Sequence, residues 1–466
     1  MTALWTSKQA EAATNGATTG NWTARGVSID SRTVAPDDLF VAIQGPNHDG
    51  GKFVEAAFAK GAAAAMVHDT PGAPGRASGP LLVVENTTAG LEALGRAARD
   101  RGHAKIVCVT GSMGKTGVKE ALALVLGQQD RVCATQGNLN NQWGLPLSLS
   151  RMSADTDFGV FELGMNRPGE IDMLTHIARP DIAIITNIDA VHLEFFDSEA
   201  AIADAKAEIF KGMGADGVAI LNRDNAYFEH LHKAASAAGI SGIRSFGAHP
   251  DSTARLTDLV LEDDHSIVCA DIDGATMRFT LGAPGRHWAL NSLAVLAAVS
   301  ALGADVVNAS ASLVGLHPLP GRGARTTIQI ESGAITVIDE SYNANPSSMR
   351  AALAVLGAAK TEGRRIAVMG DMLELGPDAA ARHADLAEAV SANAIDLVFT
   401  VGPNMARLHD ALPTAKTTAH ADASEGVAKA VVETLSAGDV VMIKGSLGSR
   451  MSVVIDAIHA QSVKKG

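Results

Sequence analysis

Thr110-Gly111-Ser112-Met113-Gly114-Lys115-Thr116 is the most informative segment of this 466-residue chain. It follows an apolar run at residues 106–109 and precedes a helical pattern at residues 118–126. Glycines in such a loop let successive backbone N–H groups point at one anion, and the helix N-terminus adds positive potential. The segment therefore predicts a phosphate-binding loop. In that loop the Lys115 ammonium reaches the β- and γ-phosphates of a nucleotide, and the Thr116 hydroxyl binds Mg²⁺.

The loop departs from the usual phosphate-binding pattern at one position. The pattern G-x-x-x-x-G-K-[ST] begins with a glycine, and this chain has Val109 in that place. A solvated lysine in a glycine-rich turn is the alternative interpretation. The order of strand, loop and helix around Lys115 favours phosphate binding.

Strand and helix patterns alternate on the C-terminal side of this loop. Short apolar runs at 158–161, 182–186 and 217–221 are typical of buried strands, and residues 199–210 have a helical pattern. Alternation of this kind predicts a parallel sheet with helices on both faces.

The alternation restarts after Pro318-Leu319-Pro320-Gly321, which is typical of a junction between domains. Four further strands are predicted there, at residues 335–338, 365–369, 397–401 and 439–443. Alanine-rich helical patterns separate them. This section therefore predicts a second, Rossmann-like doubly wound unit.

The N-terminal section is smaller. We expect strands at 38–43 and 81–84, an alanine-rich helix at 53–65, and a loop at the proline- and glycine-rich residues 71–80. The fold class is thus α/β, with about 150 residues per domain as a guide to the number of domains. The expected domains are residues 1–84, 85–318 and 319–466.

Composition excludes several classes of protein. The net charge of −13 argues against a general nucleic-acid-binding surface, which needs a basic face. We expect no membrane span, because no run of 18 apolar residues occurs, and no secretory signal at the N-terminus. Cys108, Cys133 and Cys269 show no CxxC spacing, which favours a reducing compartment. A cytoplasmic α/β enzyme is the resulting expectation. We also expect a monomer, although composition does not bear on the oligomeric state.

The spelling T-G-S-x-G-K-T resembles the Mur ligase family, which joins amino acids to bacterial cell-wall precursors. Further strings that resemble this family occur in the right order over nearly the whole chain. They are Ser28-Ile29-Asp30-Ser31-Arg32-Thr33-Val34, Asp38-Leu39-Phe40-Val41-Ala42, Gly137-Asn138-Leu139-Asn140-Asn141, Gly144-Leu145-Pro146-Leu147, Glu162-Leu163-Gly164-Met165-Asn166-Arg167-Pro168-Gly169-Glu170-Ile171, Asp339-Glu340-Ser341-Tyr342-Asn343-Ala344-Asn345-Pro346 and Gly370-Asp371-Met372-Leu373-Glu374-Leu375-Gly376.

The resemblance implies a three-domain architecture: a small α/β domain that binds a UDP-sugar, a central ATP-binding domain, and a Rossmann-like domain that receives the incoming amine. The last two strings resemble the branch that adds D-alanyl-D-alanine to UDP-N-acetylmuramoyl-tripeptide. The implied cofactors are ATP and two Mg²⁺ ions.

Such a reaction makes clear chemical demands. A carboxylate reacts with an amine near neutral pH only if its oxygen becomes a better leaving group, and ATP achieves this by phosphorylating the carboxylate. Carboxylate and triphosphate repel each other, so cations and exclusion of water are needed. Glu162 follows the strand at 158–161 and is well placed to bind Mg²⁺ beside the loop. An ordinary acidic strand end is the alternative.

The resemblance also assigns His192 and Lys206. The matching histidine of the family helps to hold the second Mg²⁺. The matching lysine is carbamylated by CO₂, which turns a cation into an anion with two oxygens. Considered alone, a loop histidine and a helical lysine are more often solvated. The implied catalytic set is Lys115, Glu162, His192 and Lys206, and the implied metal ligands are Thr116, Glu162, His192 and Lys206.

The resemblance implies further contacts with ATP. An asparagine such as Asn291 can pair with both a donor and an acceptor on the adenine edge. Arg322 is expected to reach the γ-phosphate when the domains close, and Asp339 to hold the ribose. The complete expected ATP set is Thr110, Gly111, Ser112, Met113, Gly114, Lys115, Thr116, Asn291, Arg322, Asp339 and Asn343.

The expected substrate-binding residues are polar side chains in loops. Asn343 and Asn345 flank a turn before a helix, where they would position a phosphate or the incoming dipeptide; plain turn chemistry is the alternative. Lys444-Gly445-Ser446, at the end of the last strand, is a further candidate anion site. The substrate set is Ser31, Arg32, His48, Asn138, Asn140, Asn141 and Asn345.

Two other functions remain open at this stage. One is another amide ligase of the same superfamily that adds a single amino acid to a different acceptor. The other is a nucleotide-dependent switch, although the chain has no guanine-reading Asn-Lys-x-Asp string and is long for such a protein.

Overall fold

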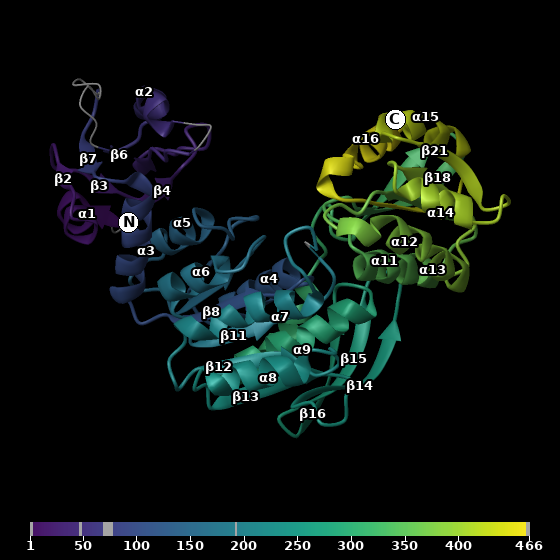
Figure 1. Ribbon diagram of the computed structural model, residues 1–466, viewed down its shortest axis with the longest axis horizontal. Coiled ribbons are helices and arrows are strands. Elements are labelled where there is room, and N and C mark those ends of the chain that lie inside the picture. Colours follow the sequence, from purple (N-terminus) through teal and green to yellow (C-terminus); the bar gives the residue numbers. More distant parts are fainter. Residues whose placement is uncertain (1–2, 46–48, 69–77, 192, 463–466) are drawn as a thin grey trace.

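The computed structural model describes residues 3–45, 49–68, 78–191 and 193–462. Figure 1 shows three bodies, with the N-terminal and C-terminal bodies standing over opposite ends of the central one. Within the described residues, no helix is long and apolar enough to cross a membrane.

The N-terminal body is built on a five-stranded sheet of order β2-β7-β6-β5-β4. The two-stranded ribbon β1–β3 lies beside it. Its strands are β1 (Trp5–Thr6), β2 (Ala17–Thr18), β3 (Thr23–Ala24), β4 (Gly26–Ser28), β5 (Asp38–Val41), β6 (Ala64–His68) and β7 (Leu81–Val84). Its helices are α1 (Ser7–Thr14), the 3₁₀ turn η1 (Gly50–Phe53), α2 (Val54–Ala59) and α3 (Thr87–Asp100).

The helix expected at 53–65 is wrong in its second half. Helix α2 ends at Ala59, Gly61 turns the chain with φ +93°, and the run beginning at Ala64 forms β6. That strand pairs in parallel with β5 and β7, so it lies inside the sheet, and its first three residues are buried. A short alanine run has no periodicity that separates a buried strand from a helix. The loop expected at 71–80 lies mostly outside the described residues.

The central body contains a nine-stranded sheet of order β16-β15-β14-β13-β12-β11-β8-β10-β9. Its strands are β8 (Lys105–Thr110), β9 (Val132–Ala134), β10 (Phe158–Glu162), β11 (Ile182–Ile185), β12 (Val218–Asn222), β13 (Gly242–Gly247), β14 (Ala254–Leu261), β15 (Ser266–Ile272) and β16 (Ala275–Leu281). Its helices are α4 (Lys115–Gly127), α5 (Gly144–Ser150), α6 (Glu170–Ala178), α7 (Glu199–Ala207), the 3₁₀ turn η2 (Glu208–Gly212), α8 (Phe228–Ala237), α9 (Arg286–Ala301), α10 (Val306–Ser312) and the 3₁₀ turn η3 (Leu313–Gly315).

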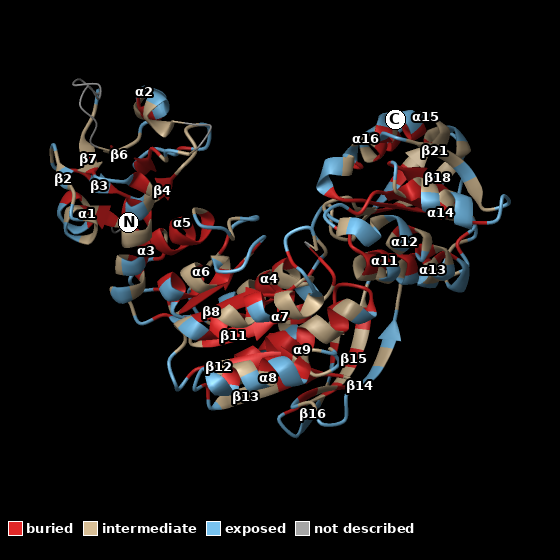
Figure 2. Ribbon diagram, in the orientation of Figure 1, coloured by how far each residue is buried: buried red, intermediate tan, exposed pale blue. Residues whose placement is uncertain are grey.

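The strands predicted in this section are confirmed as β8, β10, β11 and β12, and they pair in parallel. The sheet is not parallel throughout, however, because β14, β15 and β16 extend it as an antiparallel meander. Separate apolar cores cover its two faces, one built around α4 and α9 and the other around α6, α7 and α8. Figure 2 shows the buried strands between these helices.

The C-terminal body holds a six-stranded sheet of order β17-β18-β22-β19-β20-β21. Its strands are β17 (Ala324–Ile330), β18 (Gly333–Glu340), β19 (Arg365–Gly370), β20 (Leu397–Val401), β21 (Thr417–Ala421) and β22 (Val440–Lys444). Its helices are α11 (Pro346–Ala358), the 3₁₀ turn η4 (Gly376–Asp378), α12 (Ala379–Ala384), α13 (Leu386–Ala392), α14 (Met405–Ala411), α15 (Ser424–Thr434), the 3₁₀ turn η5 (Leu447–Ser449) and α16 (Ser452–Ala460). The four predicted strands are confirmed as β18, β19, β20 and β22; β17 and β21 were not predicted.

Candidate functional site

The loop between β8 and α4 has a backbone that requires glycine at two positions. Gly111 and Gly114 have φ values of +145° and +81°. A Cβ at Gly111 would lie 1.9 Å from the Thr186 hydroxyl oxygen, and one at Gly114 would lie 2.8 Å from the Asn291 amide nitrogen. The Ser112 N–H donates to the Asn187 carbonyl at 2.7 Å, which ties the loop to the end of β11. Because the first N–H groups of a helix have no partner within it, the start of α4 faces an anion site.

Lys115 is the first residue of α4, and its ammonium folds back over the loop. Nζ donates to the Gly111 carbonyl at 2.7 Å. Burial lowers the pKa of Lys115; the nearby Glu162 carboxylate opposes this shift and Arg322 adds to it. The ammonium thus lies at the mouth of the loop, where it would attract the negative charge of a bound phosphate.

Glu162, the last residue of β10, presents both carboxylate oxygens to the loop and is only 2% exposed. Oε2 accepts a hydrogen bond from the Thr116 hydroxyl at 2.8 Å, and Oε1 accepts one from the Asn140 amide at 2.7 Å. The backbone N–H of Glu162 donates to the Thr135 hydroxyl at 3.1 Å. Hard oxygen donors therefore gather beside the phosphate loop, as a divalent cation such as Mg²⁺ prefers.

Lys119 lies beneath this group and was not singled out from the sequence. Its side chain is fully buried, donates to the Thr135 carbonyl at 2.8 Å and forms an ion pair with Glu120. Lysine is almost never fully buried unless paired. The sequence signal was a lysine directly after the buried Val118 of the predicted helix, but such a position alone does not indicate burial.

Lys206 is buried on α7, with 2% of its surface exposed. Burial and then the charge of Lys115 hold its pKa well below the usual value for lysine. We find no hydrogen bond from its ammonium to any residue of the described ranges. His192 lies outside the described residues, so its expected proximity to Lys206 stays a prediction.

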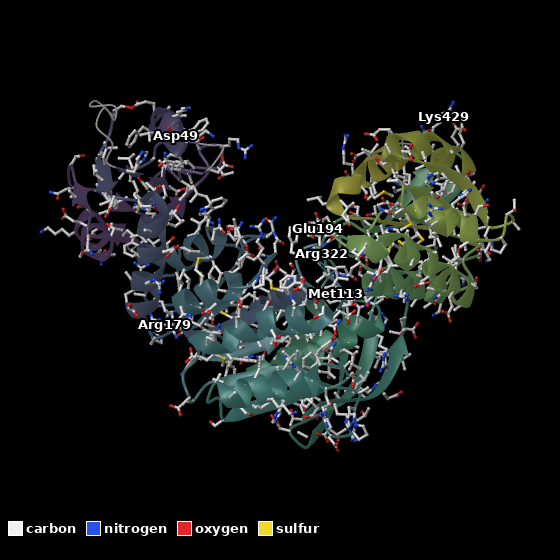
Figure 3. All side chains as sticks on the ribbon, viewed as in Figure 1. Asp49, Met113, Arg179, Glu194, Arg322 and Lys429 are labelled. Atoms are coloured by element: carbon white, nitrogen blue, oxygen red, sulfur yellow. The ribbon has the colours of Figure 1, made fainter. Side chains whose placement is uncertain are left out.

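A cavity of about 640 Å³ opens over the phosphate loop, between the central and C-terminal bodies. Figure 3 shows Met113 of the loop near Arg322, which directly follows the Pro318–Gly321 junction. Most of the residues singled out from the sequence line this one cavity. They are Ser112, Met113, Gly114, Lys115, Thr116, Asn138, Asn140, Asn141, Glu162, Asn291, Arg322, Asn343, Asn345 and Lys444.

The C-terminal body supplies the wall opposite the loop. The Arg322 guanidinium stacks on the Tyr342 ring at 4.0 Å. The buried Lys444 ammonium donates to the Asn343 carbonyl at 2.9 Å and lies 3.2 Å from Glu340. The Asn345 side chain caps α11 by accepting from the Ser348 N–H at 2.8 Å, so turn and cap chemistry accounts for its present contacts.

Several residues singled out from the sequence lie away from this cavity. Thr110 and Gly111 are not among its lining residues. The Asp339 carboxylate accepts a hydrogen bond from the Gly321 N–H at 2.7 Å, in the segment that precedes β17. Ser31 and Arg32 belong to the N-terminal body, where the exposed Arg32 pairs with Asp30 at 2.7 Å. His48 lies outside the described residues.

Comparison with known proteins gives a consistent result. Residues 23–101 match the Mur ligase family catalytic domain, 109–299 the Mur ligase middle domain, and 324–447 the Mur ligase glutamate ligase domain. A UDP-N-acetylmuramoyl-tripeptide–D-alanyl-D-alanine ligase of Rickettsia prowazekii is 32% identical, over 97% of this chain and 99% of its own length. The ligase of the same name from Escherichia coli is 34% identical over 93% of each chain.

Solved structures agree with these relatives. A crystal structure of MurF from Acinetobacter baumannii superimposes with a TM-score of 0.85 at 28% identity, covering 98% of this chain and 99% of the other. MurF of Thermotoga maritima in complex with ADP gives a TM-score of 0.78 at 28% identity, covering 94% of this chain and 98% of the other.

Proposed function

This chain belongs to the Mur ligase family, and from that premise we propose which residue performs which step of the ligation reaction. The enzyme joins D-alanyl-D-alanine to UDP-N-acetylmuramoyl-tripeptide and consumes ATP. ADP and phosphate are released, and the product is the pentapeptide precursor of peptidoglycan. The observation that carries the assignment is the single cavity that gathers the Lys115 loop, Glu162 and Arg322 at the junction of two bodies.

The chemistry proceeds in two transfers. A carboxylate oxygen of the tripeptide attacks the γ-phosphorus, the bond from this phosphorus to the bridging oxygen breaks, and ADP leaves. The amine of D-alanyl-D-alanine then attacks the acyl carbon, inorganic phosphate leaves, and the nitrogen loses a proton. Lys115 and the loop N–H groups hold the phosphates, and Arg322 lies across the cavity to balance the charge that gathers there.

Mg²⁺ fits the oxygen donors of this site. The Thr116 hydroxyl and the Glu162 carboxylate are already 2.8 Å apart, and a cation between them and a phosphate would replace their hydrogen bond. When bound, Mg²⁺ neutralises phosphate charge and makes the phosphorus easier to attack. His192 and Lys206 are our candidates for holding a second ion.

Lys206 is our candidate for carbamylation. Burial lowers the pKa of Lys206 and so favours its uncharged amine form, and such an amine adds to the carbon of CO₂ and releases one proton. The negative charge of the resulting carbamate would neutralise the positive charge of Lys115. We expect intact-protein mass spectrometry under gentle conditions to show one added CO₂. We also expect Lys206→Ala to lose activity that short carboxylic acids partly restore. An unmodified mass together with no rescue would contradict the assignment.

The division into bodies supports a division of labour. We assign the UDP-sugar to residues 1–84 with Ser31, Arg32 and His48, ATP to residues 85–318, and the incoming dipeptide to residues 319–466. Helix α3, at the start of the second range, packs in the core of the N-terminal body. Asn138, Asn140 and Asn141 line the cavity on the side of the central body, where the tripeptide would enter. Asn291, Asp339 and Asn343 are proposed for ATP and Asn345 for the dipeptide. We propose a monomer in a reducing, cytoplasmic compartment, in keeping with three free cysteines.

A phosphate-release assay with the purified protein tests the function. With ATP and Mg²⁺, phosphate should appear only when both the tripeptide acceptor and D-alanyl-D-alanine are present. Exchange of the amine for single amino acids tests the alternative ligase, which would then turn over without the dipeptide. Slow nucleotide hydrolysis that ignores both co-substrates would instead favour a nucleotide-dependent switch. Tripeptides ending in meso-diaminopimelate or lysine would show which acceptor is used.

A further inference from the structure

A second cavity of about 410 Å³ lies at the junction of the central and C-terminal bodies. The central body contributes the end of β14 and the start of α9, and the C-terminal body contributes β17 and one face of α11. Its walls are largely apolar, with Leu261, Leu290, Ala354 and Val355 among them. It adjoins the cavity over the phosphate loop, and His287, Leu290 and Ala351 border both.

Three arginines from different segments line this cavity: Arg286, Arg325 and Arg350. Within the described ranges, none of the three guanidinium groups makes a hydrogen bond or an ion pair. The Nε atom of Arg325 is in addition buried without a hydrogen-bond partner. A guanidinium without an acceptor beside an apolar wall attracts anions. Water screens the exposed Arg286 and Arg350, so the attraction is strongest at the half-buried Arg325.

The acidic residues of the cavity already have partners. Glu262 accepts a hydrogen bond from the Lys360 ammonium at 2.8 Å, and Asp263 accepts one from the Lys360 backbone N–H at 3.0 Å. Lys360 thus holds both carboxylates. The three arginines make no hydrogen bond within the described residues, in a chain whose net charge is −13. Burial lowers the pKa of Arg325, and the charges of the nearby Asp263 and Asp264 carboxylates oppose this shift, so Arg325 has acidic neighbours but no bonded acceptor.

We propose that this cavity is a binding site for a small amphipathic anion, a carboxylate or phosphate monoester carried on an apolar body. The planar guanidinium fork matches either head group with paired hydrogen bonds, and the apolar walls take the rest of the ligand. Arg286 belongs to the central body, whereas Arg325 and Arg350 belong to the C-terminal body. One bound anion would therefore link the two bodies and hold their relative orientation.

Calorimetric titration with defined probes tests the proposal. The probes are 2-naphthoate and 2-naphthyl phosphate, with the neutral 2-naphthalenemethanol as control ligand, all measured with saturating ADP and Mg²⁺ so that the nucleotide site is filled. One anion should bind per chain, and the better of the two identifies the head group. Arg350→Met, at an exposed position, should weaken binding about tenfold or more. Arg325→Met should do the same, and Arg407→Met, an exposed arginine of α14 outside both cavities, should bind as the wild type does.

Three results would overturn the proposal: no saturable binding of either anion, equal affinity in wild type and Arg350→Met, or equally tight binding of the neutral alcohol. The Arg350→Met variant carries the test if Arg325→Met fails to fold, because Arg350 is exposed and makes no hydrogen bond within the described part of the chain.

Discussion

Replacement of Lys119 by methionine tests whether this lysine positions Glu162 in addition to stabilising the central body. Methionine keeps the length and apolar stem of lysine and removes only the charge and its donors. Lys119 holds the Thr135 carbonyl at 2.8 Å, and the hydroxyl of the same Thr135 accepts from the Glu162 N–H at 3.1 Å. The ammonium thus acts on Glu162 through one intermediate residue.

The expected loss of stability follows from these contacts. A hydrogen bond from a charged donor contributes about 1.5–3 kcal/mol, and the Thr135 carbonyl would be left buried without this donor. Glu120 is 36% exposed on its side chain, so water can solvate its carboxylate once Lys119 is gone. We therefore expect Lys119→Met to lower the free energy of unfolding by about 2–3 kcal/mol, which leaves a chain of this size folded.

The assay is phosphate release at increasing Mg²⁺ concentration, with both co-substrates saturating. If Glu162 loosens, the concentration of Mg²⁺ that gives half-maximal rate should rise several-fold, and kcat should fall more than the KM for the tripeptide changes. Lys429→Met, an exposed lysine of α15, is the matched control and should behave as wild type. An unchanged Mg²⁺ dependence in a variant that shows the predicted loss of stability would refute the positioning role of Lys119.

Three further changes have distinct expected outcomes. Gly114→Ala should raise the KM for ATP about tenfold or more in steady-state kinetics, because φ +81° disfavours a side chain and the new Cβ would lie 2.8 Å from the Asn291 amide nitrogen; an unchanged KM would mean that the loop does not bind ATP in this form. Glu162→Gln keeps the shape of the side chain and removes its negative charge, so we expect turnover to fall about a hundredfold or more while the melting temperature changes little; wild-type turnover at low Mg²⁺ would contradict a role in metal binding. The Arg131 hydrogen bond lowers the pKa of Asp157 from 3.8 to about 2, so its stabilising contribution is complete above pH 3.8 and is lost as the pH falls through about 2. Acid unfolding followed by circular dichroism should therefore show Asp157→Asn less stable than wild type near neutral pH and equal to it below about pH 2; a constant difference across that window would exclude the linkage.

The elements around the phosphate loop could be predicted because their signals are local. An apolar run, two glycines and an amphipathic helix follow one another within residues 106–126, and the structure forms them in that order as β8, the loop and α4. The antiparallel strands β14 to β16 were not predicted. Strand β15 alternates buried with half-buried residues along its length, whereas β14 and β16 do so at only some positions. The helix expected at 53–65 failed where tertiary pairing turned its second half into β6.

The site was predictable at the level of residue type and chain position, but not at the level of contacts. Gathering Arg322 and Glu162 around one cavity depends on how two bodies pack, and no local pattern encodes that arrangement. The burial of Lys119 could not be predicted from the sequence for the same reason. Its burial depends on the Thr135 carbonyl and the Glu120 carboxylate being within reach, and Thr135 is 16 positions away in the chain.

Hydroxylamine trapping examines the proposed acyl phosphate itself. The protein is incubated with ATP, Mg²⁺ and UDP-N-acetylmuramoyl-tripeptide, without D-alanyl-D-alanine and with hydroxylamine as a competing nucleophile. We expect a hydroxamate of the tripeptide to form with one ADP released per hydroxamate, and to be absent in Glu162→Gln. Continued ligation under the same conditions with no hydroxamate at any hydroxylamine concentration would contradict transfer of the γ-phosphate to the tripeptide carboxylate.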